Sequence, residues 1–370
     1  MMMTTQTIFS PDLAGIAVGE TSISNVDGEA GILTYRGHPI EELVEKPFMQ
    51  VVWQVLFGPE PSGEELSSLE DFMASNSNLT AIEQAVLSAL PKDLHPMLML
   101  QTMVPMLDLT PKTELNGLST NAHSGLIIAA KLPSLIASWR QIELGNVSIS
   151  SNSNLSLHEN FLMMFNGATP TDNQTKVLDA AQILQMEHSF NAGTFAGRVC
   201  ASTLAPIQSS IAASIGTLFG VLHGGADQAA LEMAEAIGSP ELAANYVAKS
   251  LAEKIKIMGM GHREYKVVDP RAKILKPMAA KLCDSGDAKR LFDTLVAVET
   301  ECNKAFSAKG KEIWANVEFY KGAVFYQLGV PPRYFTALFA MARVYGYIAH
   351  YLEFSENSKL IRPRARYVGK

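Results

Sequence analysis

Residues 332–354, PRYFTALFAMARVYGYIAHYLEF, carry the sequence pattern that decides the fold. Apolar residues recur there at spacings of three and four, which is the period of an α-helix with a buried face. The same spacing runs through segments 68–90, 124–144 and 176–190. Segment 205–222 is apolar nearly all round and rich in small residues, which predicts a helix at the centre of the protein or at a subunit interface. The chain is therefore expected to be mostly α-helical.

The first forty residues have a different character. Segment 14–43, AGIAVGETSISNVDGEAGILTYRGHPIEEL, mixes short stretches of β type with turns that contain glycine, before Pro39 opens a helix. This pattern predicts a short β segment that precedes the helical part of the chain.

Composition excludes several classes of protein. The 370 residues are 47% hydrophobic and 18% charged, so one large domain or two ordinary ones can form around a substantial core. The net charge of -7 argues against general nucleic-acid binding, and no apolar run is long enough to cross a membrane. The N-terminus lacks the basic and apolar segments of a secretory signal, and the three cysteines form no CxxC pair. We expect a soluble, cytoplasmic protein.

An acidic residue stands in an apolar setting at residues 312–332, EIWANVEFYKGAVFYQLGVPP. Glu318 is surrounded there by aromatic and aliphatic residues that indicate burial. Burying an unpaired charge is costly, so such a carboxylate is normally paired, neutralised or functional.

Two histidines lie beside glycine-rich turns. His223 precedes Gly224 and Gly225 in LHGGADQ, where the backbone can approach a ligand closely and a helix then begins. His262 follows Gly259 and Gly261 in MGMGHREYK, which matches neither a dinucleotide-binding turn nor a Walker loop. Each histidine either works in a site or simply occupies a turn. The surrounding segment 251–281 has eight Lys and Arg residues against three acids, which suits a small polyanion or a solvated helix face.

Four further residues are candidates for holding a ligand. His188 and Asn191 are three apart in one apparently helical stretch, where a histidine is either part of the core or part of a site. Arg343 lies in a helix almost free of charge and needs an anion, either a protein acid or a bound carboxylate. Arg362 lies in the tail IRPRARYVG, which Pro363 keeps extended, so it reaches another subunit or ends in solvent. None of the histidine pairs has HxH, HxxxH or HExxH spacing, so no metal site is expected.

In order along the chain, seven segments resemble the citrate synthase family, which includes 2-methylcitrate synthase. They are GETSISNVDGEAGILTYRGHPIEEL, EHSFNAGTFAGR, LHGGADQAAL, MGMGHREYKVVDPRA, NVEFYKGAVFYQLGVP, ARVYGYIAHYLE and IRPRARYVG. The length and the missing N-terminal β domain are similar to the shorter, dimeric form of the enzyme. The resemblance implies a mostly α, two-domain fold, with residues 1–224 and 330–370 in a large helical domain and residues 225–329 in a small one.

The resemblance also implies a site in the cleft between the domains. The catalytic residues would be His223, His262 and Glu318. Oxaloacetate would be held by His188, Asn191, Arg271, Arg343 and Arg362, the last from the partner subunit of a homodimer. The loop that contacts CoA would be Lys256, Ile257, Met258, Gly259 and Met260. No metal or redox cofactor is implied, and the acyl-CoA thioester is a substrate.

Residue chemistry agrees with this implied activity. Bidentate arginines suit the two carboxylates of oxaloacetate. A carboxylate can remove a proton from an acetyl thioester if the enol oxygen is stabilised, which would be the task of His223. His262 would polarise the ketone of oxaloacetate for attack, and hydrolysis of citryl-CoA would make the condensation irreversible. The implied activity is that of an acyltransferase which converts the acyl group into an alkyl group on transfer.

Glu318 departs from the family pattern, which has Asp in NVDFY. Glutamate is one methylene longer, and a misplacement of roughly 1 Å can cost about 10²-fold in rate. Three alternatives follow: an adjusted backbone keeps Glu318 as the base, the site is tuned to another acyl-CoA or 2-oxo acid, or condensation is impaired and the chain only binds CoA and dicarboxylate. Gly193, where relatives usually have Ser, is a smaller departure. The leading hypothesis is citrate synthase, and 2-methylcitrate synthase acting on propionyl-CoA is the alternative.

Overall fold

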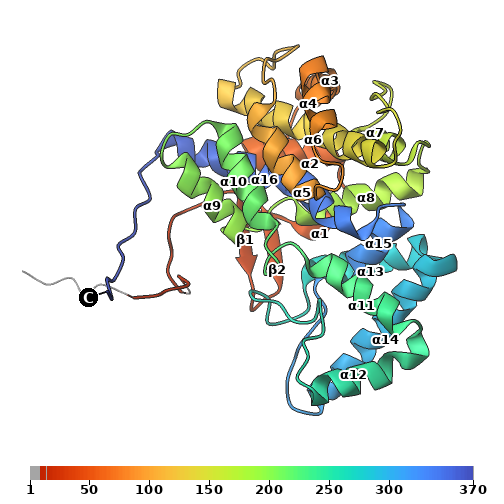
Figure 1. The fold of residues 1–370 in the computed structure, drawn as a ribbon. Helices are drawn as coiled ribbons and strands as arrows, with labels where there is room; N and C mark the ends of the chain where they lie inside the picture. The colour runs from red at the N-terminus through yellow and green to blue at the C-terminus, as the bar shows by residue number, and fades with distance from the viewer. Residues whose placement is uncertain (1–8, 14, 370) are drawn as a thin grey trace, which may run out of the picture.

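The computed structural model describes residues 9–13 and 15–369 and is mostly helical, which confirms the predicted fold class (Figure 1). Within these residues one small antiparallel sheet lies near the N-terminus, in the order β1, β2, β3. Its strands are β1 (Ser24–Asp27), β2 (Ile32–Tyr35) and β3 (His38–Pro39). The predicted β segment is therefore present, and Pro39 directly precedes the first helix as expected.

The helices follow one another through the remainder of the described chain. The first eight are α1 (Ile40–Leu43), α2 (Phe48–Phe57), α3 (Gly63–Asn76), α4 (Ala81–Ala89), α5 (Pro96–Met103), α6 (Thr120–Glu143), α7 (Leu157–Asn166) and α8 (Asp172–Gln185). The next eight are α9 (Ala192–Ala201), α10 (Ile207–Leu218), α11 (Ala226–Ile237), α12 (Ala243–Ala252), α13 (Pro270–Leu282), α14 (Gly286–Ser307), α15 (Val317–Gln327) and α16 (Phe335–Glu356). Short 3₁₀ turns are η1 (Val104–Met106), η2 (Pro240–Leu242) and η3 (Pro332–Tyr334).

Helix α16 lies at the centre of the large group of helices. Residues 335–351 are all buried, as the nearly uncharged sequence of this helix requires. It packs against α2, α6, α8, α9 and α10, which surround it in Figure 1. A charged side chain on this helix, such as Arg343, therefore lies inside the protein.

Some of the segments with continuous helical spacing are interrupted, because capping residues begin or end helices inside them. Thr80 accepts a hydrogen bond from the N–H of Glu83, whose side chain accepts from the N–H of Thr80, so a new helix begins inside segment 68–90. Segment 176–190 is helical only to Gln185. Segment 124–144, by contrast, forms a single helix up to Glu143, which continues through Pro133.

Helices α11 to α14 gather on one side of the molecule, at the lower right of Figure 1. Helix α15 packs against α11, α13 and α14 and also against α8, so it lies between this group and the rest. The predicted division into residues 1–224 with 330–370 and residues 225–329 stays a prediction. Among the described residues, no helix is both long and apolar enough to cross a membrane.

Candidate active site

Glu318 lies in the first turn of α15 and is partly exposed. The backbone around it is fixed on two sides. The N–H of Val317 donates to Oδ2 of Asp269 at 3.1 Å, and the N–H of Asn316 donates to the carbonyl of Gly259 at 3.0 Å. A β-bridge between residues 260 and 315 ties the loop before His262 to the same segment. Residues far apart in the sequence therefore meet at this carboxylate.

Positive charge gathers around the Glu318 carboxylate. Burial raises the pKa of this group, but the charges of Arg271 and Lys321, joined by His262 when acid pH protonates it, outweigh burial and lower the pKa to about 2. The carboxylate is thus ionised at neutral pH, the form that a proton acceptor needs.

His262 has its tautomer set by the backbone. Its Nδ1 accepts the N–H groups of Glu264 and Tyr265, each at 3.1 Å, so the neutral ring carries its proton on Nε2. Nη2 of Arg271 lies 3.3 Å from that Nε2. Two donors therefore converge on one small region, where an acceptor oxygen fits. Burial, then the charge of Arg271, lowers the pKa of His262 and keeps the ring neutral.

His223 lies in the turn between α10 and α11. Its Nε2 is buried and has no hydrogen-bond partner among the residues that the structure describes. Burial and the charge of Arg343 lower its pKa to about 4, while the Glu318 carboxylate opposes this shift. His223 is therefore a neutral imidazole close to both charges, with a nitrogen left for a ligand.

Two buried arginines flank these groups. Arg271 binds Asp269 through Nε at 3.0 Å and Nη2 at 2.8 Å, which holds its guanidinium in a fixed plane. Arg343 donates from Nε to the carbonyl of Gln185 at 2.6 Å and forms no ion pair with any described residue. Its charge is among the causes that lower the pKa of the buried protein acid Glu187, so both alternatives for Arg343 stay open. Its terminal nitrogens and Nη1 of Arg271 are the donors that remain.

His188 reaches the same place from a different segment. Its Nε2 lies 3.1 Å from the hydroxyl of Tyr265, and its ring lies 5.6 Å from the ring of His262, centroid to centroid. Burial, followed by the charges of Arg271 and Arg343, lowers the pKa of His188 well below its usual value. His188 is therefore a neutral ring on which the charges of both guanidinium groups act.

Asn191 does not share a helical face with His188, and that expectation was wrong. Helix α8 ends at Gln185, Ser189 has a φ of +51°, and Asn191 caps the next helix. Its Oδ1 accepts the N–H of Thr194 at 3.1 Å and its Nδ2 donates to Oγ1 of Thr194 at 2.9 Å. The apolar spacing continued across a break that depends on this local cap. Contact between Asn191 and substrate stays a prediction.

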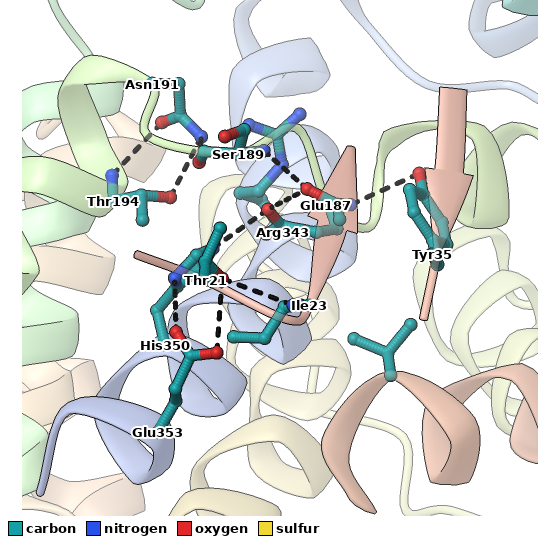
Figure 2. A network of polar contacts seen from close by, with 12 residues as sticks. Thr21, Ile23, Tyr35, Glu187, Ser189, Asn191, Thr194, Arg343, His350 and Glu353 are labelled. Atoms are coloured by element: carbon teal, nitrogen blue, oxygen red, sulfur yellow. Dashed lines mark hydrogen bonds and ion pairs between the residues drawn. The ribbon is translucent and has the colours of Figure 1, made fainter. Parts of the chain in front are cut away.

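A buried polar network holds the His188 loop in position (Figure 2). Glu187 accepts from Oγ of Ser24 at 3.0 Å and lies 2.9 Å from Nε2 of His350. The N–H of Ser189 donates to Oγ of Ser24 at 2.9 Å. Strand β1 and helix α16 thereby fix the backbone on either side of His188.

The predicted CoA loop contacts the Glu318 segment with only part of its length. Ile257, Gly259 and Met260 are buried, whereas Lys256 is exposed and Met258 is partly exposed. A Cβ added at Gly259, where φ is +76°, would lie 2.7 Å from the ring of Phe319. Glycine is needed there for close packing. Contact with CoA stays a prediction for all five residues.

Arg362 lies in an exposed tail, residues 358–369, with no helix or strand. The tail leaves the body of the protein at the left of Figure 1. The contribution of Arg362 across a homodimer remains a prediction.

Three residues of the site were missed by sequence reasoning. Asp269 orients Arg271 and binds the N–H of Val317, Tyr265 contacts His188, and Lys321 lies near Glu318. The Asp-Pro pair at the start of α13 and a second charge three residues after Glu318 were signals that could have found two of them. The described residues contain no group of three or more His, Cys, Asp or Glu side chains that could hold a metal.

Comparison with known proteins identifies the family of this chain. The family model "Citrate synthase, C-terminal domain" matches residues 12–364. The chain belongs to the citrate synthase family. It is 38% identical to the citrate synthase of Acidithiobacillus ferridurans, over 98% of this chain and 96% of that protein. It is 35% identical to the 2-methylcitrate synthase of Shewanella oneidensis, over 96% of this chain and 94% of that protein.

A solved structure is also similar over nearly the whole length. The citrate synthase of the archaeon Thermoplasma acidophilum, in a ternary complex with carboxymethyl coenzyme A and oxaloacetate, aligns with a TM-score of 0.88 and 28% identity. The alignment covers 96% of this chain and 95% of that one. These comparisons confirm the resemblance, the fold and the prediction of an enzyme of the citrate synthase type.

Proposed function

We propose that this chain condenses acetyl-CoA with oxaloacetate and hydrolyses the resulting citryl-CoA to citrate and CoA. One observation carries the proposal. The buried Nε2 of His223 has no partner within the described chain and lies near an ionised Glu318, while His262 and Arg271 direct two donors at one point. An acid, a base and a pair of anion-binding groups are the parts that this reaction needs.

Oxaloacetate would occupy the region between the two arginines. Its carboxylates would accept hydrogen bonds from the terminal nitrogens of Arg343 and from Arg271, which Asp269 holds in a fixed plane. The neutral His188 would donate or accept beside them. Nε2–H of His262 would bind the ketone oxygen, which makes the carbonyl carbon more electrophilic.

Condensation would then proceed at the acyl thioester. The carboxylate of Glu318 would take a proton from the methyl carbon of acetyl-CoA, while Nε2–H of His223 stabilises the enol oxygen. The enol carbon would form a bond to the ketone carbon of oxaloacetate, and the ketone oxygen would take the Nε2 proton of His262. The proton that Glu318 removed would return to that nitrogen, which restores the neutral ring and the ionised carboxylate. Water would then cleave the thioester of citryl-CoA, releasing citrate and the CoA thiol.

The proposal also covers the domain arrangement, the homodimer and the cellular compartment of the enzyme. Residues 225–329 would form a small domain that closes over the substrates and excludes water from the enol. Lys256 to Met260 would contact CoA, and Asn191 would support the oxaloacetate pocket. A homodimer would supply Arg362 to the partner site. The enzyme would work in the cytoplasm with neither a metal nor a redox cofactor.

Release of free CoA thiol tests the proposal. The protein is mixed with acetyl-CoA and oxaloacetate, thiol is followed with a chromogenic disulfide, and citrate is identified by mass. The proposal expects thiol release that depends on oxaloacetate and falls at least about 10²-fold in His262→Gln. Binding of both substrates without thiol release would overturn it and favour the non-catalytic alternative.

A second candidate is supported by the 35% identity to a 2-methylcitrate synthase. Acetyl-CoA and propionyl-CoA differ by one methylene, and an apolar pocket discriminates between such substrates by only about 1–3 kcal/mol. Small differences in the acyl pocket are therefore enough to change the preferred substrate. The ratio of kcat/KM for acetyl-CoA and propionyl-CoA decides between them. A clear preference for propionyl-CoA would replace the first candidate by the second.

A further inference from the structure

A buried ion pair includes Lys321, which follows the candidate base by three residues on α15. Nζ of Lys321 is 2.9 Å from Oδ2 of Asp227, and both side chains are 0% exposed. The proposed reaction uses neither residue. Burying two charges carries a desolvation penalty of several kcal/mol per ion, which makes such a pair weak evidence for stability alone.

The pair joins α15, which carries Glu318, to α11, the helix that begins just after His223. Asp227 lies in the first turn of α11, four residues after His223, and Lys321 lies three residues after Glu318 on α15. Residues three apart on a helix share a face. A Cβ added at Gly322 would lie 2.8 Å from the backbone carbonyl oxygen of Asp227, so the backbones of the two helices approach closely at this point. The pair therefore fixes the spacing between the His223 turn and the Glu318 turn.

Aromatic rings extend this connection to α16. Nζ of Lys321 lies 4.4 Å from the ring centroid of Phe339 and 5.7 Å from that of Phe325. The guanidinium carbon of Arg343 lies 4.8 Å from the same Phe339 ring. Cations bind aromatic faces at these distances. The ammonium is thus held by one carboxylate and two rings, and Phe339 links it to the candidate oxaloacetate-binding arginine.

We propose that Lys321 is a positioning residue: anchored by Asp227 and Phe339, its ammonium keeps the Glu318 carboxylate in place opposite His223. This inference rests on the proposed function of Glu318 as a base. It explains how the chain tolerates the longer glutamate, because a side chain with an extra rotatable bond needs a fixed counter-charge to hold one direction.

Electrostatics around Glu318 agree with this arrangement. The charge of Lys321 is among the causes that lower the pKa of Glu318, after that of Arg271 on α13 and before that of His262. Burial raises the pKa of Asp227, against the charge of Lys321, and Glu318 raises it further. On α14 the charged group that faces α15 is Glu299, which accepts from the hydroxyl of Tyr320.

The test removes the pair as a unit. Lys321→Met alone would leave Asp227 buried and unpaired and could prevent folding, so the variant is Lys321→Met with Asp227→Asn. Asparagine retains an acceptor for the N–H of Gln228, which now donates to Oδ1 of Asp227 at 2.8 Å. The control is Lys131→Met with Glu83→Gln, which removes another buried pair with an Nζ to Oε1 distance of 2.7 Å. That pair lies on α6 and α4, outside the candidate site.

Two measurements follow. The first is kcat for thiol release, together with KM for oxaloacetate. The second is the titration of Glu318 by ¹³C NMR with ¹³Cδ-labelled glutamate, assigned through Glu318→Gln. The second readout does not depend on activity.

We expect the pair variant to lose about tenfold in kcat with an unchanged KM for oxaloacetate, and Glu318 to titrate about one pH unit higher. The control should change neither. A titration of Glu318 that is unaltered in the pair variant, or altered equally in the control, overturns the inference. The wild type could release no thiol while Glu318 still titrates at higher pH in the pair variant than in the wild type. That result would contradict the proposed function and would leave the positioning role of Lys321 intact.

Discussion

Shortening Glu318 by one methylene tests whether the site is adjusted to the longer side chain of glutamate. In Glu318→Asp the carboxylate withdraws by roughly 1 Å, which costs about 10²-fold in rate, or about 2.7 kcal/mol, if nothing moves to compensate. The structure gives α15 little freedom to move. Its start is held by the 3.1 Å bond from Val317 to Asp269 and the 3.0 Å bond from Asn316 to Gly259. Gly259 is in turn packed closely on Phe319.

The assay is thiol release at saturating oxaloacetate, with acetyl-CoA varied. We expect kcat to fall about 10²-fold in Glu318→Asp while KM for oxaloacetate stays the same, since both arginines are untouched. Glu318→Gln is the matched control, because it keeps the length and removes the charge, and it should lose more. An aspartate variant that equals or exceeds the wild type would refute the reasoning and mark the longer side chain as a handicap.

Three further predictions concern binding, packing and pH. Arg343→Lys should raise KM for oxaloacetate about tenfold or more in steady-state kinetics, because lysine cannot present two planar donors; an unchanged KM would contradict this role. Gly193→Ser should lower the free energy of unfolding by about 1–3 kcal/mol in urea titrations, since its Cβ would lie 2.4 Å from Oη of Tyr347, and adding Tyr347→Phe should restore most of the loss. The free energy of unfolding should also fall as pH drops from about 6.5 toward 4, by at most about 1.4 kcal/mol per pH unit for each histidine. In this pH range the three histidines bind protons in the unfolded chain but stay neutral in the folded one, because burial lowers the pKa of His188, His223 and His262. Midpoints of urea unfolding that stay constant between about pH 6.5 and 4 would contradict these lowered pKa values.

Periodic apolar spacing was enough to predict the helices, but it missed breaks that depend on single residues. The long run ending at residue 354 became the buried helix α16 because almost nothing polar interrupts it. Residues 176–190 kept a helical spacing, yet the chain turns at Ser189 and starts again at Asn191. Such breaks are set by local hydrogen bonds that compete with the helix, and periodicity does not register them.

Candidate site residues were predictable where their chemistry conflicted with their surroundings. Glu318 and Arg343 stood out as charges in apolar segments, and the charges of both act on the pKa of His223. Residues that act through another side chain were harder to find. The role of Asp269 in orienting Arg271 is visible only once the loop and α15 meet in space. The pairing of Lys321 with Asp227 joins positions 94 apart in the chain, and no local pattern predicts that contact.

A crystal structure of this protein with oxaloacetate and an unreactive acetyl-CoA analogue measures the central arrangement directly. The account predicts a Glu318 carboxylate oxygen about 3–3.5 Å from the carbon that replaces the methyl group, with Nε2 of His223 donating to the thioester oxygen. Arg343 should hold a carboxylate of oxaloacetate through its terminal nitrogens. A complex in which Glu318 points away from that carbon and another group takes its place would contradict the account.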